Sequence, residues 1–164
     1  MENVILVNDK DEPMGSMEKL EVHQKGLLHR AFSVMVFNSN KELLLQQRAF
    51  TKYHSPGLWT NTCCSHPRPG EDTKEAAQRR LYEEMGIHCE LHKKFDFIYC
   101  THFENGLVEH EFDHVFIGTS DADPVVNKTE VADWKWCTID NIKNKIEQQP
   151  EEYSAWFKIL MAEY

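Results

Sequence analysis

The sequence lacks long apolar runs, and none approaches the roughly 20 residues needed to cross a bilayer. It also lacks internal repeats, low-complexity tracts and linkers rich in proline, glycine and serine. Residues 1–11 alternate apolar and polar side chains and show no secretory signal pattern. We therefore expect one domain over residues 1–164, located in the cytoplasm and not bound to a membrane.

Positive charge is scarce, with 18 lysines and arginines against 27 aspartates and glutamates, a net charge of -9. A general nucleic-acid binder normally shows a basic face, so we expect no nucleic-acid partner. An anionic small molecule would have to be held by a few clustered cations or by bound metal.

Disulfides are not expected either. Five cysteines are an odd number, and Cys63 and Cys64 are adjacent, which suits reduced thiols better than a disulfide framework. We interpret Cys63 as a small buried hydrophobe, and Cys89, Cys100 and Cys137 as packing residues.

The apolar runs and helix signals of the sequence predict a mixed-sheet α/β sandwich. Apolar runs predict strands at 4–7, 32–37, 43–47, 95–102, 108–117 and 134–138, with a hairpin turn at residues 104–106. A helix is predicted over 73–85, since Asp72 and Glu75 resemble a capping box and Gly86 suits a helix end. Its buried stripe would be Ala77, Leu81 and Met85. A last helix is predicted over 153–162.

Nine histidines justify a search for metal ligands. In a strand, Glu109 and Glu111 project from the same side, and they would repel each other unless a cation lay between them. With His23, His29 and His66 they form a set that suits a divalent Zn²⁺, Mn²⁺ or Mg²⁺ with more than four ligands. The alternative is that each histidine is a surface or hydrogen-bonded residue and that the two acids face solvent. This ordinary role is our expectation for the remaining histidines, which are His54, His88, His92, His102, His110 and His114.

Two further groups can carry chemistry. A cysteine beside an imidazole and a metal, in the segment 60–67, can carry a proton or act as a nucleophile. Lys19, Arg48, Lys52 and Arg80 are candidates for binding a diphosphate, with ordinary solvated side chains as the alternative.

The stretch 65–87 resembles the Nudix box, Gly-x5-Glu-x7-Arg-Glu-U-x-Glu-Glu-x-Gly-U, where U is apolar. The positions in register are Glu71, Arg79, Leu81, Glu83, Glu84, Gly86 and Ile87. Ser65 replaces the opening glycine, and Arg80 replaces the glutamate after the arginine. Nudix hydrolases gather Mg²⁺ ions with the helix carboxylates, so Arg80 favours a site that holds a diphosphate without cutting it.

The altered box, the segment Thr-Asn-Thr-Cys-Cys-Ser-His-Pro before it and Glu-His-Glu after it resemble the type 1 isopentenyl-diphosphate isomerase family over residues 4–156. This resemblance implies a Nudix-like α/β/α sandwich with a mixed β-sheet. It also implies interconversion of isopentenyl and dimethylallyl diphosphate by a metal-dependent 1,3-allylic proton shift through a carbocation-like intermediate.

The resemblance also implies roles for individual residues. Cys64 and Glu111 would transfer protons, Tyr99 would hydrogen-bond in the site, and Trp156 would face the hydrocarbon. The implied metal ligands are His23, His29, His66, Glu109 and Glu111, and the implied diphosphate contacts are Lys19, Arg48, Lys52 and Arg80. The implied cofactors are one divalent Mn²⁺, Zn²⁺ or Mg²⁺ in the His/Glu set and a Mg²⁺ that Glu84 helps to bind with the diphosphate.

Two other functions remain open from the sequence. A Nudix-type diphosphate hydrolase would keep the fold and release phosphate or pyrophosphate. A non-catalytic module would bind metal or diphosphate without turnover. In each case we expect a monomer or a weak homodimer.

Overall fold

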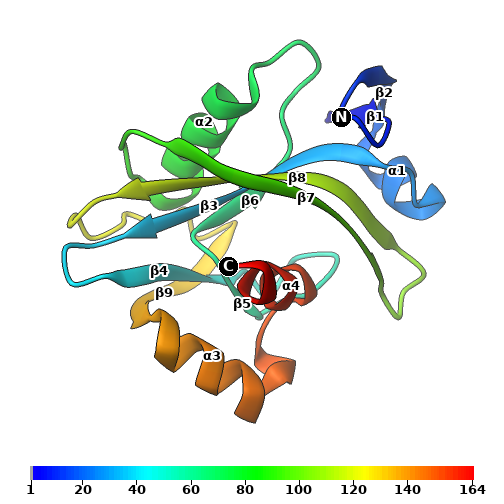
Figure 1. Ribbon diagram of the computed structural model, residues 1–164. Coiled ribbons are helices and arrows are strands. Elements are labelled where there is room, and N and C mark those ends of the chain that lie inside the picture. The colour runs from blue at the N-terminus through cyan, green and yellow to red at the C-terminus, as the bar shows by residue number, and fades with distance from the viewer. Residues whose placement is uncertain (1) are drawn as a thin grey trace.

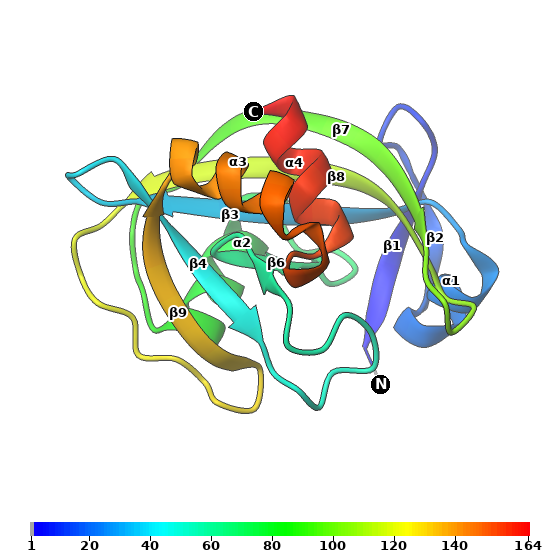
Figure 2. The ribbon, with the colours of Figure 1, turned by 90° about the horizontal axis from the view of Figure 1, so that it is seen from below.

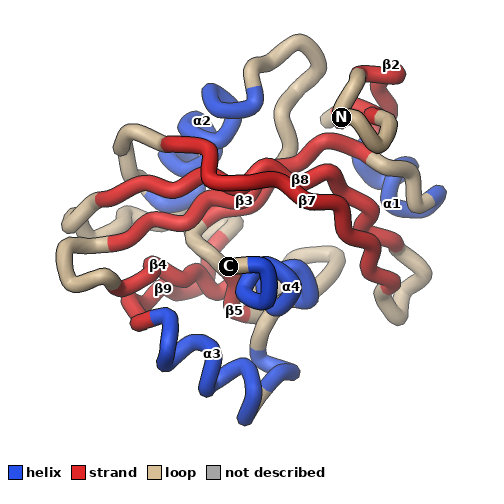
Figure 3. Tube along the Cα trace, in the orientation of Figure 1, coloured by secondary structure: helices blue, strands red, loops and turns tan. Residues whose placement is uncertain are grey.

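The computed structural model describes residues 2–164, in which a mixed β-sheet lies between helices (Figures 1 and 3). The strands are β1 (Asn3–Val7), β2 (Pro13–Glu18), β3 (His29–Phe37), β4 (Glu42–Arg48), β5 (Trp59–Thr60), β6 (Cys63–Ser65), β7 (His92–His102), β8 (Val108–Thr119) and β9 (Val131–Thr138). The α-helices are α1 (Lys19–Lys25), α2 (Thr73–Met85), α3 (Ile139–Gln148) and α4 (Ala155–Glu163). The expected α/β/α sandwich is therefore observed.

Strand β3 organises the sheet. It pairs in parallel with β8 and antiparallel with β6, and β8 in turn pairs antiparallel with β7. The β3–β8 register places His29 opposite Glu111, and the β7–β8 register places Tyr99 opposite that same glutamate. Strand pairing alone thus brings three of the predicted site residues together.

Strand alternation divides the core into two layers. Val34 and Val36 of β3 pack toward α2, whereas Met35 between them packs with α3 and α4. Successive side chains of a strand point to opposite faces, which explains this division. Figure 2, seen from below, shows α3 and α4 together on the face opposite α2.

Helix α2 has the predicted bounds. The Asp72 side chain accepts a hydrogen bond from the Glu75 N–H at 3.1 Å, and Gly86 ends the helix with a φ of 66°. Ala77, Leu81 and Met85 are fully buried, as their four-residue spacing predicts.

The sequence did not predict the short elements β2, α1, β5 and β6. It also did not predict the longer helix α3. Helix α3 has Ile142 as its one buried residue, and Ile139 and Ile146 are partly buried against the same core layer. The last helix begins at Ala155 and not at residue 153, because a 3₁₀ turn, Pro150–Glu152, precedes it.

The five cysteines are free thiols, as expected. Cys63 is fully buried, and Cys89 and Cys137 pack against the two core layers. The prediction for Cys100 is wrong, because it is exposed on β7. Within residues 2–164, no helix has both the length and the apolar character to span a membrane.

Candidate active site

A buried cluster of imidazoles and carboxylates lies at one end of the sheet. It consists of His23 from α1, His29 from β3, His66 after β6, and Glu109 and Glu111 from β8. One nitrogen or oxygen atom from each side chain lies within 4.8 Å of the others. Glu109 and Glu111 project to the same side, as their spacing in a strand predicts.

Backbone carbonyls orient two of the rings. The Nδ1 atom of His23 lies 2.6 Å from the Lys19 carbonyl oxygen, and that of His29 lies 2.9 Å from the Leu27 carbonyl oxygen. A ring whose Nδ1–H donates to a carbonyl presents the Nε2 lone pair on its other side, which is the arrangement of metal-ligating histidines.

The Nε2 atoms of His29 and His66 and a carboxylate oxygen of Glu111 lie close enough together to share one cation. His29 Nε2 lies 3.3 Å from His66 Nε2, and His66 Nε2 lies 2.7 Å from Glu111 Oε2. Burial lowers the pKa of His66, which favours the neutral imidazole that ligates metals. Imidazole nitrogens beside two carboxylates fit a divalent ion, so these residues can hold one.

Glu109 is ionised in this setting. Burial alone would raise its pKa, but hydrogen bonds with His23 and His54 bring it well below its usual range. The Nε2 atom of His23 lies 2.6 Å from Glu109 Oε1.

The Tyr99 hydroxyl donates a hydrogen bond to Oε1 of Glu111. Burial, together with the nearby Glu111 carboxylate, raises the pKa of Tyr99 well above its usual value, so the phenol stays protonated. Tyr99 is therefore a fixed donor to a carboxylate that also faces His29 and His66.

The Cys64 thiol has its own polar surroundings. Its Sγ donates to Asn61 Oδ1 at 3.0 Å and lies 3.5 Å from the Ser33 hydroxyl oxygen. That hydroxyl donates to Asp113 Oδ2 at 2.7 Å. Burial, with a smaller contribution from Asp113, raises the pKa of Cys64, so the sulfur is a thiol at neutral pH.

One cavity joins these groups. Cys64, Tyr99, Glu111 and Trp156 line it, as do the four predicted diphosphate cations Lys19, Arg48, Lys52 and Arg80, and Glu84. Trp156, on α4, is 5% exposed, and the Arg48 guanidinium lies 5.0 Å from the centre of its ring system. The cavity thus has an apolar aromatic wall and a charged region.

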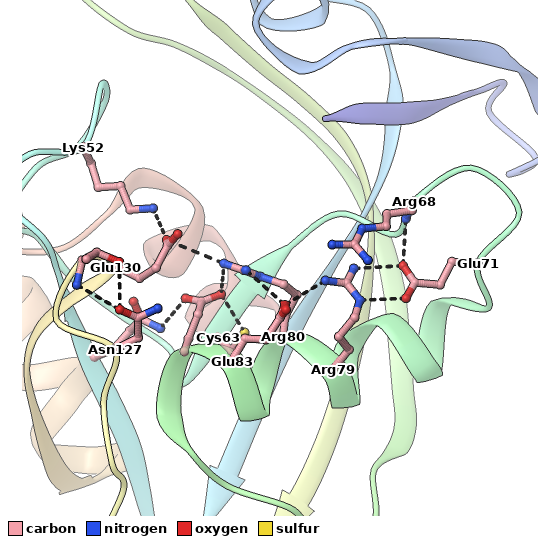
Figure 4. A network of polar contacts seen from close by, with 12 residues as sticks. Lys52, Cys63, Arg68, Glu71, Arg79, Arg80, Glu83, Asn127 and Glu130 are labelled. Atoms are coloured by element: carbon pink, nitrogen blue, oxygen red, sulfur yellow. Dashed lines mark hydrogen bonds and ion pairs between the residues drawn. The ribbon is translucent and has the colours of Figure 1, made fainter. Parts of the chain in front are cut away.

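The charged region is built on α2 and two loops (Figure 4). Arg80 Nη2 lies 3.0 Å from Glu84 Oε2, and Glu84 also accepts from Gln46 and Cys63 at 3.2 and 3.3 Å. The Lys52 ammonium pairs with Glu130. Arg80 and Glu84 are four residues apart on α2, the spacing at which opposite charges on a helix pair.

Some residues of the cavity were not predicted. His54 is 7% exposed, its Nε2 lies 3.4 Å from Glu109 Oε1, and its ring stacks on Phe103. Of the two ordinary roles expected for His54, a surface or a hydrogen-bonded residue, the second is observed, and its partner Glu109 belongs to the His/Glu set. Ser33, Asn61, Asp113 and Glu130 were also missed. Ser33, Asp113 and Glu130 meet their partners through contacts between distant segments, which no local spacing reveals, whereas Asn61 lies three residues before Cys64.

Comparisons with known proteins agree with this architecture. The family model for the NUDIX domain matches residues 27–157. The chain is 54% identical to isopentenyl-diphosphate Delta-isomerase 2 of Aromatoleum aromaticum, over 94% of this chain and 82% of that protein. It is 52% identical to isopentenyl-diphosphate Delta-isomerase of Pectobacterium atrosepticum, over 97% of this chain and 89% of the relative. Among solved structures, DR0079 of Deinococcus radiodurans superposes with a TM-score of 0.82 at 21% identity, over 99% of this chain and 98% of that one.

Proposed function

The chain belongs to the NUDIX family and, within it, to the isopentenyl-diphosphate Delta-isomerases, and we propose that it interconverts isopentenyl diphosphate and dimethylallyl diphosphate. The observation that carries the proposal is the single cavity in which Cys64 and Glu111 lie with an aromatic wall and four cationic side chains. A five-carbon diphosphate needs the same three features, which are proton-transfer groups, an apolar surface and phosphate-binding cations.

The reaction moves one proton in and another out. A proton added to the terminal carbon of the alkene leaves a tertiary cation, and loss of a proton two carbons away forms the new double bond. Such a reaction needs an acid and a base near the substrate and little water between them. Cys64 and Glu111 take these two roles and exchange them in the reverse direction.

The surroundings of each group suit its role. Cys64 is a thiol that can give up a proton, with Asn61 and Ser33 as neighbours that fix its position. Glu111 is held by Tyr99, which donates to it and can relay a proton. A divalent ion held by the His/Glu cluster would supply positive charge beside Glu111 and so set the acidity of its carboxyl group.

The substrate's two ends meet different parts of the cavity. The Trp156 indole can stabilise a nearby cation by about 2 kcal/mol when water is excluded. That is roughly a thirtyfold effect on rate, so acid–base positioning must supply most of the acceleration. Lys19, Arg48, Lys52 and Arg80 hold the diphosphate, and Glu84 helps to bind a Mg²⁺ that arrives with it. The ion in the His/Glu cluster is Mn²⁺, Zn²⁺ or Mg²⁺.

The test is incubation with isopentenyl diphosphate and Mg²⁺ in D₂O, followed by NMR. We expect dimethylallyl diphosphate that carries deuterium at the newly protonated carbon. Release of phosphate or pyrophosphate with an unchanged alkene would support a hydrolase. No reaction after addition of Zn²⁺ or Mn²⁺ and a reductant would support a binding module.

A further inference from the structure

Glu130 occupies the space between two of the cations that line the cavity. Its carboxylate pairs with the Lys52 ammonium, and its Oε2 lies 3.6 Å from Arg80 Nη2. Figure 4 shows Glu130 between these two side chains. Glu130 also lines the cavity itself, so its negative charge lies where a bound anion would lie.

The backbone holds Glu130 in this place. The Asn127 N–H donates to the Glu84 carbonyl at 2.9 Å, which ties the turn to the end of α2. At the other end of the turn, the Ala49 N–H donates to the Glu130 carbonyl at 3.0 Å, directly after β4. The position of Glu130 is therefore fixed by the sheet and by α2, and only its side chain is free to turn.

Three glutamates surround Arg80, and they differ in what holds them. Glu84 is 6% exposed and accepts hydrogen bonds from three side chains, so it belongs to the floor of the site. Glu83 pairs with Arg80 and with Arg79, and it does not line the cavity. Glu130 is 28% exposed, and its carboxylate has only Lys52 and Arg80 as charged partners among the described residues.

We propose that Glu130 is an internal counter-ion that occupies the diphosphate subsite of the free protein, and that a diphosphate binds by displacing it from Lys52 and Arg80. The inference rests on the proposed function only in that these two cations hold a diphosphate. A diphosphate beside an unmoved Glu130 would place like charges together, which costs free energy.

Displacement lowers the affinity of the subsite for any anion that needs both cations. The free energy needed to separate Glu130 from Lys52 and Arg80 is the same for each such anion, so it reduces their affinities by one common factor. Removing the charge of Glu130 therefore tightens the binding of pyrophosphate, and it tightens the binding of inorganic phosphate by no larger a factor.

The experiment compares three proteins, the wild type, Glu130→Gln and Glu83→Gln, by calorimetric binding of inorganic pyrophosphate and of inorganic phosphate. Glu83→Gln is the matched control, because it removes one charge from the same arginine outside the cavity. We expect Glu130→Gln to bind pyrophosphate about tenfold more tightly, equivalent to about 1.4 kcal/mol, and to bind phosphate more tightly by no larger a factor. Glu83→Gln is expected to bind both anions as the wild type does.

Unchanged or weaker pyrophosphate binding by a folded Glu130→Gln protein would overturn the proposal. Weaker binding confined to the Mg²⁺ complex would overturn it too, and would assign Glu130 to holding that ion. If Glu130→Gln does not fold by circular dichroism, Glu130→Asp replaces it, because its shorter charged side chain reaches the cations less well and should give a smaller gain of the same sign. Absence of pyrophosphate binding in every protein would also refute the inference, and the deuterium assay would then decide separately whether the isomerase function stands.

Discussion

Cys63 and Cys64 are neighbours in the chain with opposite surroundings. Both lie on β6, whose alternation points Cys63 toward α2 and Cys64 toward the cavity. The Cys63 thiol is fully buried and donates to Glu84, whereas the Cys64 thiol faces Asn61 and Ser33. This difference supports a structural role for Cys63 and the proposed chemical role for Cys64.

We predict that Cys64→Ala and Glu111→Gln each abolish isomerase turnover and leave the circular dichroism spectrum unchanged, because each removes one of the two proposed proton-transfer groups. Cys63→Ala is the control. It should keep most of the activity and lose about 1–2 kcal/mol of unfolding free energy, since it leaves a small cavity and removes a donor to Glu84. Near-normal activity in Cys64→Ala would contradict the assignment, and equal losses in both cysteine variants would mean that the wrong neighbour was chosen.

The raised pKa of Cys64 also predicts its reactivity. The thiolate is the form that reacts with iodoacetamide, and a pKa raised by burial leaves little thiolate at pH 7.5. We expect exposed Cys100 to be alkylated first, and Cys64 to react appreciably only above about pH 8.5, the value at which an unfolded cysteine is half ionised. Mass spectrometry of peptides after timed quenching measures both sites. Faster modification of Cys64 than of Cys100 at pH 7.5 would show that burial does not suppress ionisation of the Cys64 thiol.

At the scale of elements, the end of α2 packs closely against the segment that contains Val125. Gly86 has a φ of 66°, and a Cβ there would lie 2.7 Å from the Val125 carbonyl oxygen. Gly70 has a similar φ of 80°, but a Cβ there would have no neighbour within 4 Å. Alanine substitutions at these two glycines therefore separate the cost of backbone strain from the cost of steric overlap.

We predict that Gly70→Ala lowers the unfolding free energy by about 1–2 kcal/mol, the cost of a left-handed conformation with a Cβ. Gly86→Ala bears the same cost and must also push the chain away from Val125, so its loss should exceed that of Gly70→Ala by at least about 1 kcal/mol. Urea denaturation measures both variants. Equal losses would mean that the 122–127 segment moves away freely from the end of α2.

The elements differ in how far the sequence predicts them. Helix α2 was predicted with its observed bounds, because it has a cap, a stop and several turns of apolar spacing. Helix α1 and strand β6 have only seven and three residues, too few for any periodicity to show. Both form through tertiary contacts, yet they carry His23, which the search for metal ligands named, and Cys64, whose proton-transfer role only the family resemblance implied.

The residues of the cavity also divide into those that local spacing predicts and those that tertiary contacts bring together. The spacing of Glu109 and Glu111 in a strand predicts their shared face, and helix periodicity predicts the pairing of Arg80 with Glu84. The positions of His54 and Glu130 depend on loops that fold back on β8 and α2, and a single sequence gives no measure of such contacts. Motifs name most of the cations and acids of the cavity, but the pairing of Lys52 and Arg80 with Glu130 becomes visible only in the fold.

For the whole molecule, the site is also a junction between elements. The His/Glu cluster takes residues from α1, β3, β8 and the segment after β6. Helix α1 and the β1–β2 hairpin lie together at one edge of the sheet (Figure 2). A bound ion would therefore connect this edge to the central strands.

We predict that a divalent ion raises the melting temperature and that a chelator reverses the rise, because the ion binds the folded cluster and not the unfolded chain. At a free ion concentration of 100 times the Kd, the stabilisation is about 2.7 kcal/mol. For a chain of this length, that corresponds to roughly 5–10 °C, measured by calorimetry with Zn²⁺, Mn²⁺ or Mg²⁺. His23→Ala removes the ligand that α1 contributes and should lose most of the shift, whereas His92→Ala, at an exposed position, should keep it. A full shift in His23→Ala would place the stabilising ion outside the cluster, and the connection between α1 and the sheet would then depend on protein contacts alone.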